Sequence, residues 1–327
     1  MVYINIPNSD DSELLPFYLA AEEYVAHHIE ADECFFMWQV EPTVIFGRNQ
    51  LIENEVNINF CRERGINMFR RKSGGGCVYA DKSNIMFSYI CGGEAVQFTF
   101  DRYLRMVAFL LQKLGLKAQA SSRNDITIDG KKVSGNAFYH VPGKNIVHGT
   151  MLYDTHMENM VGSITPDDQK LLTKGVQSVR QHITLLKDYI GERMDIEAFK
   201  DYIKENLCDE ELTLNDDAID QIREIEKEYL SDEFIYGKNP RYSVLLNKHV
   251  ENCGVFDVRV EVKNGTIRNV NMMGDYFLVG DLDKGLLNRL RDIPYDKKDV
   301  AKAIDGCNTE DYILNLDKEQ FINLLFK

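Results

Sequence analysis

Alternation of apolar and polar residues predicts short strands and long amphipathic helices in the first part of the chain. Strands are expected at residues 2–6, 34–40 and 43–47. Apolar residues recur at helical spacing over residues 12–29 and again over 100–115. The second helix is expected to end at Gly115, because glycine readily adopts the left-handed conformation that closes many helices. The two kinds of element alternate irregularly along the chain.

A different pattern begins near residue 248. Two alternating runs within residues 256–273 flank Asn264-Gly265, the strongest short signal for a two-residue hairpin turn. Helical patterns follow at residues 297–304 and 318–326. We therefore expect two domains, a large one at residues 1–247 and a small α+β domain at residues 248–327.

Charge is distributed very unevenly along the 327 residues. The net charge of -14 argues against a general nucleic-acid binder, since such proteins need a basic face. Residues 187–234 hold 17 acids and 6 bases, which predicts a solvated surface of acidic amphipathic helices. Residues 62–72 reverse the balance, with five cations against one acid. A local anion site on an acidic protein is therefore expected there.

Cysteine usage and hydropathy indicate the cellular compartment. The seven cysteines are odd in number and widely spaced, and no C-x-x-C pair occurs, so we expect reduced thiols and neither disulfides nor a zinc site. No apolar run approaches the ~18 residues of a membrane span. The N-terminus carries acids where a signal peptide has basic residues. These features predict a cytoplasmic protein without membrane or nucleic-acid partners.

A glycine triplet follows three consecutive basic positions in "RRKSGGG", residues 70–76. Glycines let main-chain N–H groups approach a ligand without a Cβ in the way, and the neighbouring cations neutralise carboxylate or phosphate charge. The spacing matches neither a Walker loop nor a dinucleotide fold. Taken alone, the segment fits an anion site and a flexible hairpin turn equally well.

A second segment, "RNDITIDGKKVSG", contains the hairpin signal Asp129-Gly130. The register set by this turn pairs Ile128 with Lys131, Thr127 with Lys132 and Ile126 with Val133. Asp125, Thr127, Lys132 and Ser134 then share a polar face, with Lys132 roughly 7–8 Å diagonally from Asp125 at Cα. Lys131 extends into water. An isolated lysine pair is most often two solvated turn residues, but a cation and an acid on one face fit a site for an anion and a metal-bound nucleotide.

Two further segments carry polar side chains. "KNIVHGTMLYD" places His148-Gly149 at the expected start of a strand, where a lone histidine is more often structural than catalytic. "KGVQSVRQHITLL", residues 174–186, predicts a polar loop that runs into an apolar end.

Together and in this order, the four segments resemble motifs of the lipoate-protein ligase family. "RRKSGGGCVYAD" is similar to its lipoate-binding loop, "RNDITIDGKKVSG" to its lysine motif, "HGTMLYD" to the strand that follows, and "KGVQSVRQHIT" to its adenylate-binding loop. The resemblance covers nearly the whole chain, including the C-terminal accessory domain of bacterial members. Ala80 is a departure, since many relatives have histidine there.

The resemblance implies a fold and a reaction. The fold is α+β, a mixed sheet flanked by helices like the catalytic domains of biotin ligases and class II aminoacyl-tRNA synthetases, plus the small C-terminal domain. ATP with Mg²⁺ activates lipoate to lipoyl-AMP and pyrophosphate. The lipoyl group then passes to a lysine of an acceptor protein, either a 2-oxoacid dehydrogenase E2 lipoyl domain or the glycine-cleavage H protein.

The resemblance also implies roles for individual residues. Lys132 is the catalytic cation, and Asp125 is the metal candidate. Trp38 is expected either in the wall of the acyl site or as a core aromatic. The residues implied for ATP and adenylate are Arg71, Gly75, Gly76, Cys77, Val78, Tyr79, Asn84, Asn124, Asp125, Lys132, Lys174, Gly175, Val176, Ser178, Val179 and Arg180. Those implied for lipoate are Arg70, Arg71, Ser73, Gly74, Gly75, Lys132, Gly135 and His148.

Three other functions are considered. An octanoyltransferase on the same scaffold uses a cysteine thioester, but no cysteine lies between Cys91 and Cys208, in the lysine and "HG" region. A biotin ligase would carry an alternating Gly-Arg pattern in its glycine-rich motif. A non-catalytic module that binds lipoyl domains is disfavoured, because the lysine, the glycines and the closing loop are all present.

Overall fold

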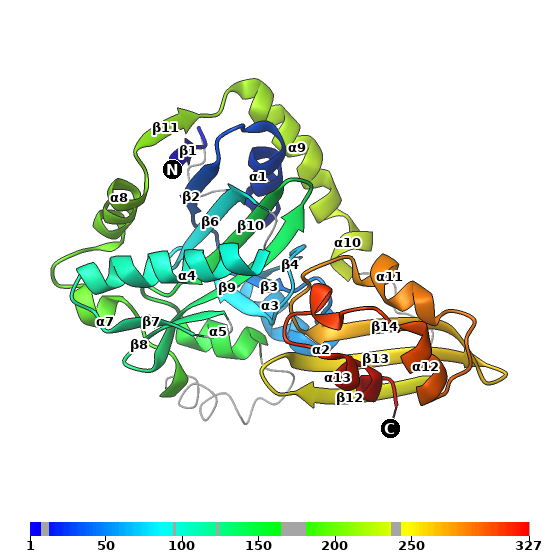
Figure 1. The fold of residues 1–327 in the computed structure, drawn as a ribbon. Coiled ribbons are helices and arrows are strands. Elements are labelled where there is room, and N and C mark those ends of the chain that lie inside the picture. The colour runs from blue at the N-terminus through cyan, green and yellow to red at the C-terminus, as the bar shows by residue number, and fades with distance from the viewer. Residues whose placement is uncertain (8–12, 94–95, 122–123, 165–180, 237–242, 327) are drawn as a thin grey trace. The chain divides into compact units, whose positions relative to one another are not determined.

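A computed structural model of the protein forms two compact units (Figure 1). The first unit comprises residues 1–46, 52–71 and 77–235, and the second comprises residues 47–51, 72–76 and 236–327. The structure describes residues 1–7, 13–93, 96–121, 124–164, 181–236 and 243–326.

An eight-stranded mixed sheet forms the centre of the first unit, in the order β11-β1-β2-β6-β10-β9-β8-β7. β1 pairs in parallel with β11 and β2, and the pairs from β2 to β7 are antiparallel. The predicted mixed sheet is therefore confirmed. Its strands are β1 (Val2–Asn5), β2 (Glu33–Trp38), β6 (Ile85–Gly92), β7 (Ala118–Ala120), β8 (Asp125–Ile128), β9 (Lys131–Val141), β10 (Lys144–Met151) and β11 (Glu210–Thr213).

Helices α1 (Leu15–His28) and α4 (Val96–Lys113) cover opposite faces of this sheet. Neighbouring residues of a strand point to opposite faces, so Phe138 and Tyr139 of β9 identify the two sides. The Phe138 ring lies 4.8 Å from that of Phe100 in α4. Tyr139 packs on the ring of His148, which in turn contacts α1. Both predicted helices are confirmed.

The remaining helices of the first unit lie around the sheet. A smaller sheet orders β4 (Asn67–Arg70), β3 (Thr43–Phe46) and β5 (Val78–Ala80) with β3 in the middle. The acidic segment forms amphipathic helices as predicted, and α9 packs against α1. The helices are α2 (Ile52–Glu55), α3 (Ile58–Arg64), α5 (Met157–Ile164), α7 (Lys187–Ile190), α8 (Ile196–Leu207), α9 (Asp216–Leu230) and α10 (Asp232–Tyr236).

The second unit is a three-stranded antiparallel sheet with short helices. Asn264 and Gly265 have φ values of 52° and 74°. Two positive φ values define the type I′ turn that the sequence predicts. The predicted boundary between residues 247 and 248 falls inside β12. The elements are β12 (Val244–Val250), β13 (Gly254–Lys263), β14 (Thr266–Asp275), α11 (Leu282–Gly285), α12 (Lys297–Ala303) and α13 (Lys318–Leu324), with short 3₁₀ turns at Leu287–Leu290 and Thr309–Asp311.

Two further features concern the cysteines and the helices. All seven cysteines are free thiols. Within the described ranges, no helix has both the length and the apolar character that crossing a membrane requires.

Helix α13 offers a test of local stability, because a reciprocal capping box begins it. The Asp317 carboxylate accepts from the Gln320 main-chain N–H at 2.7 Å, and the Gln320 side chain accepts from the Asp317 N–H at 3.0 Å. We expect Asp317→Ala to lower the free energy of unfolding by about 1 kcal/mol in urea titration. Asp317→Asn keeps the acceptor and should stay within a few tenths of wild type. Equal losses in both variants would contradict the capping role.

Candidate functional site

The hairpin that carries Lys132 has the predicted turn but not the full predicted register. Asp129 and Gly130 have φ values of 50° and 79°, which is the type I′ conformation. Lys132 pairs with Thr127 as predicted. Beyond that pair the register shifts, so the predicted partnership of Ile126 with Val133 is wrong, and Ile126 pairs with Ser134. The cause is a β-bulge, which places one extra residue in one strand.

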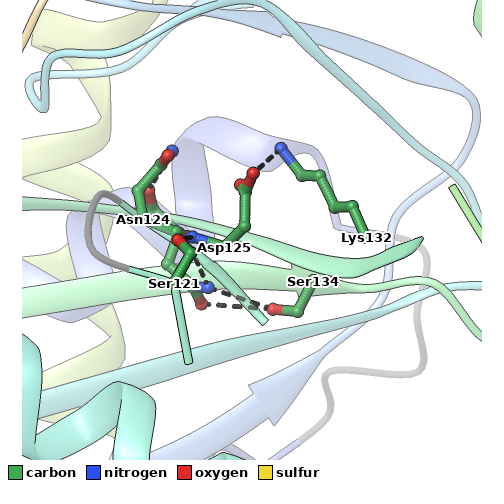
Figure 2. Close-up of polar contacts among 6 residues, drawn as sticks. Ser121, Asn124, Asp125, Lys132 and Ser134 are labelled. Carbon is green, nitrogen blue, oxygen red and sulfur yellow. Dashed lines mark hydrogen bonds and ion pairs between the residues drawn. The ribbon is translucent and has the colours of Figure 1, made fainter. Parts of the chain in front are cut away.

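The bulge decides which residues share the polar face. Asp125 lies opposite Gly135, and Ser134 is buried at 2% exposure, away from the face on which it was predicted. The Lys132 Nζ lies 2.8 Å from Asp125 Oδ1, as Figure 2 shows. Both side chains are about one-third exposed, at 34% and 31%. A Cβ on Gly135 would lie 2.7 Å from this Nζ, so any other residue there would require the Lys132 side chain to shift.

Two asparagines join the strands beside this ion pair. The Asn136 Nδ2 donates to the main-chain oxygen of Asn124 at 3.0 Å, and the Asn124 Nδ2 donates to that of Asn136 at 3.1 Å. The Asn124 side chain, predicted to contact the nucleotide, is thus engaged within the protein. A Cβ on Gly149 would lie 1.9 Å from Asn136 Oδ1. The glycine of the "HG" pair therefore makes space for Asn136, which sequence reasoning did not single out.

The C-terminal end of the predicted adenylate loop pairs with the lysine strand. Ile183 forms a parallel bridge with Lys132, and the Thr184 N–H donates to the Lys132 oxygen at 2.8 Å. The loop residues predicted to contact the adenylate lie outside the described residues. They are Lys174, Gly175, Val176, Ser178, Val179 and Arg180.

His148 lies inside β10 and not at its start, so that prediction is wrong. The sequence pattern predicted a strand that begins at His148. The strand in fact begins four residues earlier, at Lys144, and pairs with β6 and β9 along its length. The His148 Nδ1 lies 2.9 Å from Glu22 Oε2. Both side chains are buried, at 6% and 0% exposure. A buried carboxylate needs such partners, because desolvation of an unpaired charge is very costly.

Glu22 extends this contact to Trp38. The Ser88 hydroxyl donates to Glu22 Oε1 at 2.6 Å, and the Trp38 indole N–H donates to Ser88 Oγ at 2.8 Å. Neither Glu22 nor Ser88 was predicted as a site residue. The available signal for Glu22 was an acid inside a helical segment that is otherwise largely apolar.

The Tyr139 hydroxyl adds a polar atom to the same region. This hydroxyl is buried, with Glu22 and Tyr229 as polar neighbours. Burial, with the Glu22 carboxylate nearby, raises the pKa of Tyr139 well above its ordinary value. The phenol is therefore neutral and remains a potential hydrogen-bond donor.

Arg70 and Arg71 are buried, at 6% and 5% exposure, and both donate to main-chain oxygens of the first unit. The Arg70 Nε lies 2.9 Å from the Phe234 oxygen, and the Arg71 Nη1 lies 3.0 Å from the Ile45 oxygen. These arginines connect β4 and the residue after it to α10 and β3 of the first unit.

The glycine triplet belongs to the second unit, together with Ser73. The Gly75 N–H donates to the Tyr276 oxygen at 2.9 Å. A Cβ on Gly74 would lie 2.3 Å from that same oxygen, and one on Gly76 would lie 2.9 Å from the Asp275 carboxylate. Gly75 has a φ of 85°, a conformation that L side chains rarely adopt. Within this unit each glycine thus has its own reason: main-chain contact at Gly74, a positive φ at Gly75 and the Asp275 carboxylate beside Gly76.

Cys77, Val78 and Tyr79 return the chain to the first unit, where β5 pairs with β3. Burial raises the pKa of the Cys77 thiol well above its ordinary value. The thiolate is the nucleophilic form of cysteine, so this environment disfavours covalent catalysis at Cys77.

Asn84 is fully buried and only partly hydrogen-bonded. Its Nδ2 donates to Thr155 Oγ1 at 2.6 Å and to Asp81 Oδ1 at 3.3 Å. Its Oδ1 accepts no hydrogen bond from the described residues. A buried acceptor without a donor is uncommon and is the kind of group that a ligand or water satisfies.

A magnesium ion would find one carboxylate at the lysine hairpin. Across the described ranges, no cluster of three or more His, Cys, Asp or Glu side chains could hold a metal ion. Mg²⁺ in nucleotide enzymes is commonly held by one or two carboxylates together with phosphates and water. The single Asp125 carboxylate fits that mode of binding and does not fit an all-protein metal site.

Comparison with known proteins finds lipoate-protein ligase relatives for both units of the chain. Residues 16–208 match the family model of the lipoyl protein ligase A/B catalytic domain, and residues 239–325 match that of the bacterial lipoate protein ligase C-terminus. The chain is 31% identical to lipoate-protein ligase LplJ of Bacillus subtilis, over 100% of both proteins.

Two solved structures share the fold. P. falciparum LipL1, solved in complex with lipoate, has a TM-score of 0.70 at 20% identity and covers 98% of this chain and 97% of its own. A bi-partite lipoate protein ligase of Thermoplasma acidophilum, solved in a study with its E2 lipoyl domain, has a TM-score of 0.65 at 23% identity. That match covers 74% of this chain and 98% of the archaeal chain.

Proposed function

The chain belongs to the lipoate-protein ligase family, and from this premise we propose that it activates lipoate with ATP and transfers the lipoyl group to an acceptor lysine. The first half-reaction forms lipoyl-AMP and releases pyrophosphate. In the second, the acceptor lysine amine attacks the acyl carbon of lipoyl-AMP, which forms an amide and releases AMP. The observation that carries the proposal is the Lys132 ammonium, held over Gly135 by Asp125 in a chain that matches a ligase from end to end.

Lys132 suits the first half-reaction because two anions must meet. The lipoate carboxylate attacks the α-phosphorus of ATP, and repulsion between them opposes their approach. A fixed cation between the two lowers this barrier, and its position matters as much as its charge. The partly exposed ammonium, anchored at one side by Asp125, is available to both anions.

Other nucleotide contacts rest on the family resemblance and on local chemistry. The unsatisfied Asn84 Oδ1 supports a role in ligand binding. Asp125 would hold Mg²⁺, which when bound neutralises phosphate charge. Within the first unit, the main chain of Cys77 to Tyr79 would contact lipoate and ATP, as would Arg70 and Arg71.

We place the lipoyl chain against His148 and Trp38, on the face of the sheet that α1 covers. Lys132 lies on this face too. Its partner Asp125 pairs with Gly135 of β9, and paired residues share a face. Gly135 lies two residues before Ala137 and four before Tyr139, so it belongs to the same face as they do. The Glu22 pair with His148 and the neutral Tyr139 phenol supply the polar groups there.

The acceptors we propose are E2 lipoyl domains and the glycine-cleavage H protein, modified in the cytoplasm. The archaeal protein of similar fold, studied with its own E2 lipoyl domain, supports the first of these. The direct test is lipoate-dependent exchange of pyrophosphate into ATP by the purified protein without an acceptor. Exchange supports the ligase; octanoyl transfer from an acyl carrier without exchange would identify a transferase.

Neighbouring lysines provide a matched pair for the site assignment. Lys132→Ala should nearly abolish both half-reactions, because removal of one preorganised electrostatic group costs about 10²–10³ in rate. Lys131→Ala should leave most activity, since Lys131 is exposed beside the turn. Pyrophosphate exchange and transfer from prepared lipoyl-AMP measure the two steps. Loss of activity in Lys131→Ala with a nearly silent Lys132→Ala would refute the assignment.

Cys77 separates the ligase from a thioester mechanism. Cys77→Ala should retain most exchange and transfer activity, because burial keeps the thiol protonated and the main chain makes the proposed contacts. Mass spectrometry of the wild-type protein after incubation with acyl donors checks for a thioester. A trapped acyl group on Cys77, with complete loss of transfer in the alanine variant, would overturn the ligase mechanism.

The second unit offers a test of how the glycine loop is supported. A chain ending at Ile235 lacks the Tyr276 oxygen that accepts from Gly75. We expect it to lose lipoate activation more than transfer from prepared lipoyl-AMP, since loop positioning matters when two anions meet. The far-UV circular dichroism of the shortened chain reports whether it keeps its overall helix content and is folded. Equal losses in both half-reactions by a folded chain would contradict this division of labour.

A further inference from the structure

We propose that Asn136 is a positioning residue that fixes Asp125, and through Asp125 the ammonium of Lys132. This inference rests on the proposed function for its kinetic consequences, but its structural content stands without them. Asn136 is 3% exposed, lies on β9 and has no direct contact with Lys132 in the hydrogen-bond and ion-pair network.

Strand pairing alone does not fix the position of Asp125 relative to Lys132. Lys132 belongs to the regular tip of the hairpin, where it pairs with Thr127. Asp125 lies beyond the register shift, where it pairs with Gly135. A bulge interrupts the ladder and increases the local twist, so the pairing at the tip does not set the position of Asp125 relative to Lys132.

A set of hydrogen bonds joins the strands on the far side of the bulge. Asn136 donates twice to the Asn124 oxygen, from its main-chain N–H and from its Nδ2, each at 3.0 Å. Asn124 returns one bond, from its Nδ2 to the Asn136 oxygen at 3.1 Å. Asn124 directly precedes Asp125, so these three bonds fix the residue from which the Asp125 main chain starts.

Two hydrogen bonds with Ser121 hold the main chain of Asp125 itself. The Asp125 N–H donates to Ser121 Oγ at 2.9 Å, and the Ser121 N–H donates to the Asp125 oxygen at 2.8 Å. The main chain of Asp125 is thus held from both sides, and its carboxylate points toward Lys132, as the labelled side chains in Figure 2 show.

Contacts at both ends of its amide hold the Asn136 side chain in one rotamer. Its Nδ2 also donates to Ser134 Oγ at 3.1 Å. Its Oδ1 occupies the space that a Cβ on Gly149 would need. A buried side chain with both ends of its amide occupied has little freedom to turn. Asn136 can therefore transmit the geometry of β9 and β10 to the ion pair.

An activity-independent experiment tests the structural claim. An amine-reactive acetylating reagent labels lysines of the full-length protein without substrates, and mass spectrometry compares Lys132 with Lys131. In Asn136→Ala we expect labelling of Lys132 to rise about 3- to 10-fold over wild type, with Lys131 unchanged, because the ammonium loses a fixed partner. An unchanged ratio would overturn the proposal.

Kinetics test the consequence for the reaction. We expect Asn136→Ala to lower kcat of pyrophosphate exchange by about 10- to 100-fold with KM values within about threefold, the pattern of a misplaced catalytic group. Asn136→Asp has the same shape but replaces the donor with a carboxylate facing the Asn124 oxygen, so it should be equally impaired with its packing retained. Full activity in Asn136→Asp would contradict the role of the donor.

A matched control separates positioning from general stability. Asn145 is also a buried asparagine, on β10, with its Nδ2 donating to the Gly93 oxygen and to Thr99 Oγ1, each at 3.2 Å. Asn145→Ala should lower the urea midpoint but leave kcat near wild type. If Asn145→Ala reduced kcat as much as Asn136→Ala, the effect would be one of stability and the proposal would fail.

A double-mutant cycle identifies Asp125 as the intermediary. If Asn136 acts through Asp125, then Asn136→Ala should change kcat by less than about twofold in an Asp125→Asn background. Multiplicative losses would refute transmission through Asp125. Absence of exchange in the wild-type protein would refute the proposed function instead, and the labelling ratio would still decide the role of Asn136.

Discussion

The site depends on one ion pair whose importance is its position and not its stability. Lys132 and Asp125 are each about one-third exposed, and exposed pairs of this kind contribute little to folding. Their geometry is nevertheless tightly specified, by a type I′ turn on one side of a bulge and by the Asn124 bonds on the other. The proposed reaction joins two anions and needs a cation at a defined point, which Lys132 of the hairpin would provide.

Three glycines of the sequence motifs act through the absence of a Cβ. Gly135 leaves room for the Lys132 ammonium, Gly149 for the Asn136 amide, and Gly74 for the Tyr276 main-chain oxygen. In each case the neighbour is a polar group that a methyl group would displace. The motifs "KVSG", "HG" and "GGG" thus have a common physical basis, although they lie far apart in the sequence.

The sheet separates the proposed site from the helix that supports its other face. The α1 face carries the lysine hairpin and the buried chain from His148 through Glu22 and Ser88 to Trp38. The α4 face combines apolar contacts, such as that of Phe100 with Phe138, with the buried hydrogen bond from Asn145 to Thr99. A long β9 bridges the two functions, since its alternate residues serve one face and then the other.

The sequence by itself determined what short-range chemistry controls. Asp129-Gly130 and Asn264-Gly265 specify their turns, because both central residues of a type I′ turn need positive φ and these residue types tolerate it. The amphipathic helices and the motif order were likewise readable. Only the tertiary structure decided the bulge after Lys132, the burial of Glu22 against His148, and the membership of residues 72–76 in the second unit. Each of these depends on residues distant in sequence, whose packing and hydrogen bonds no local pattern records.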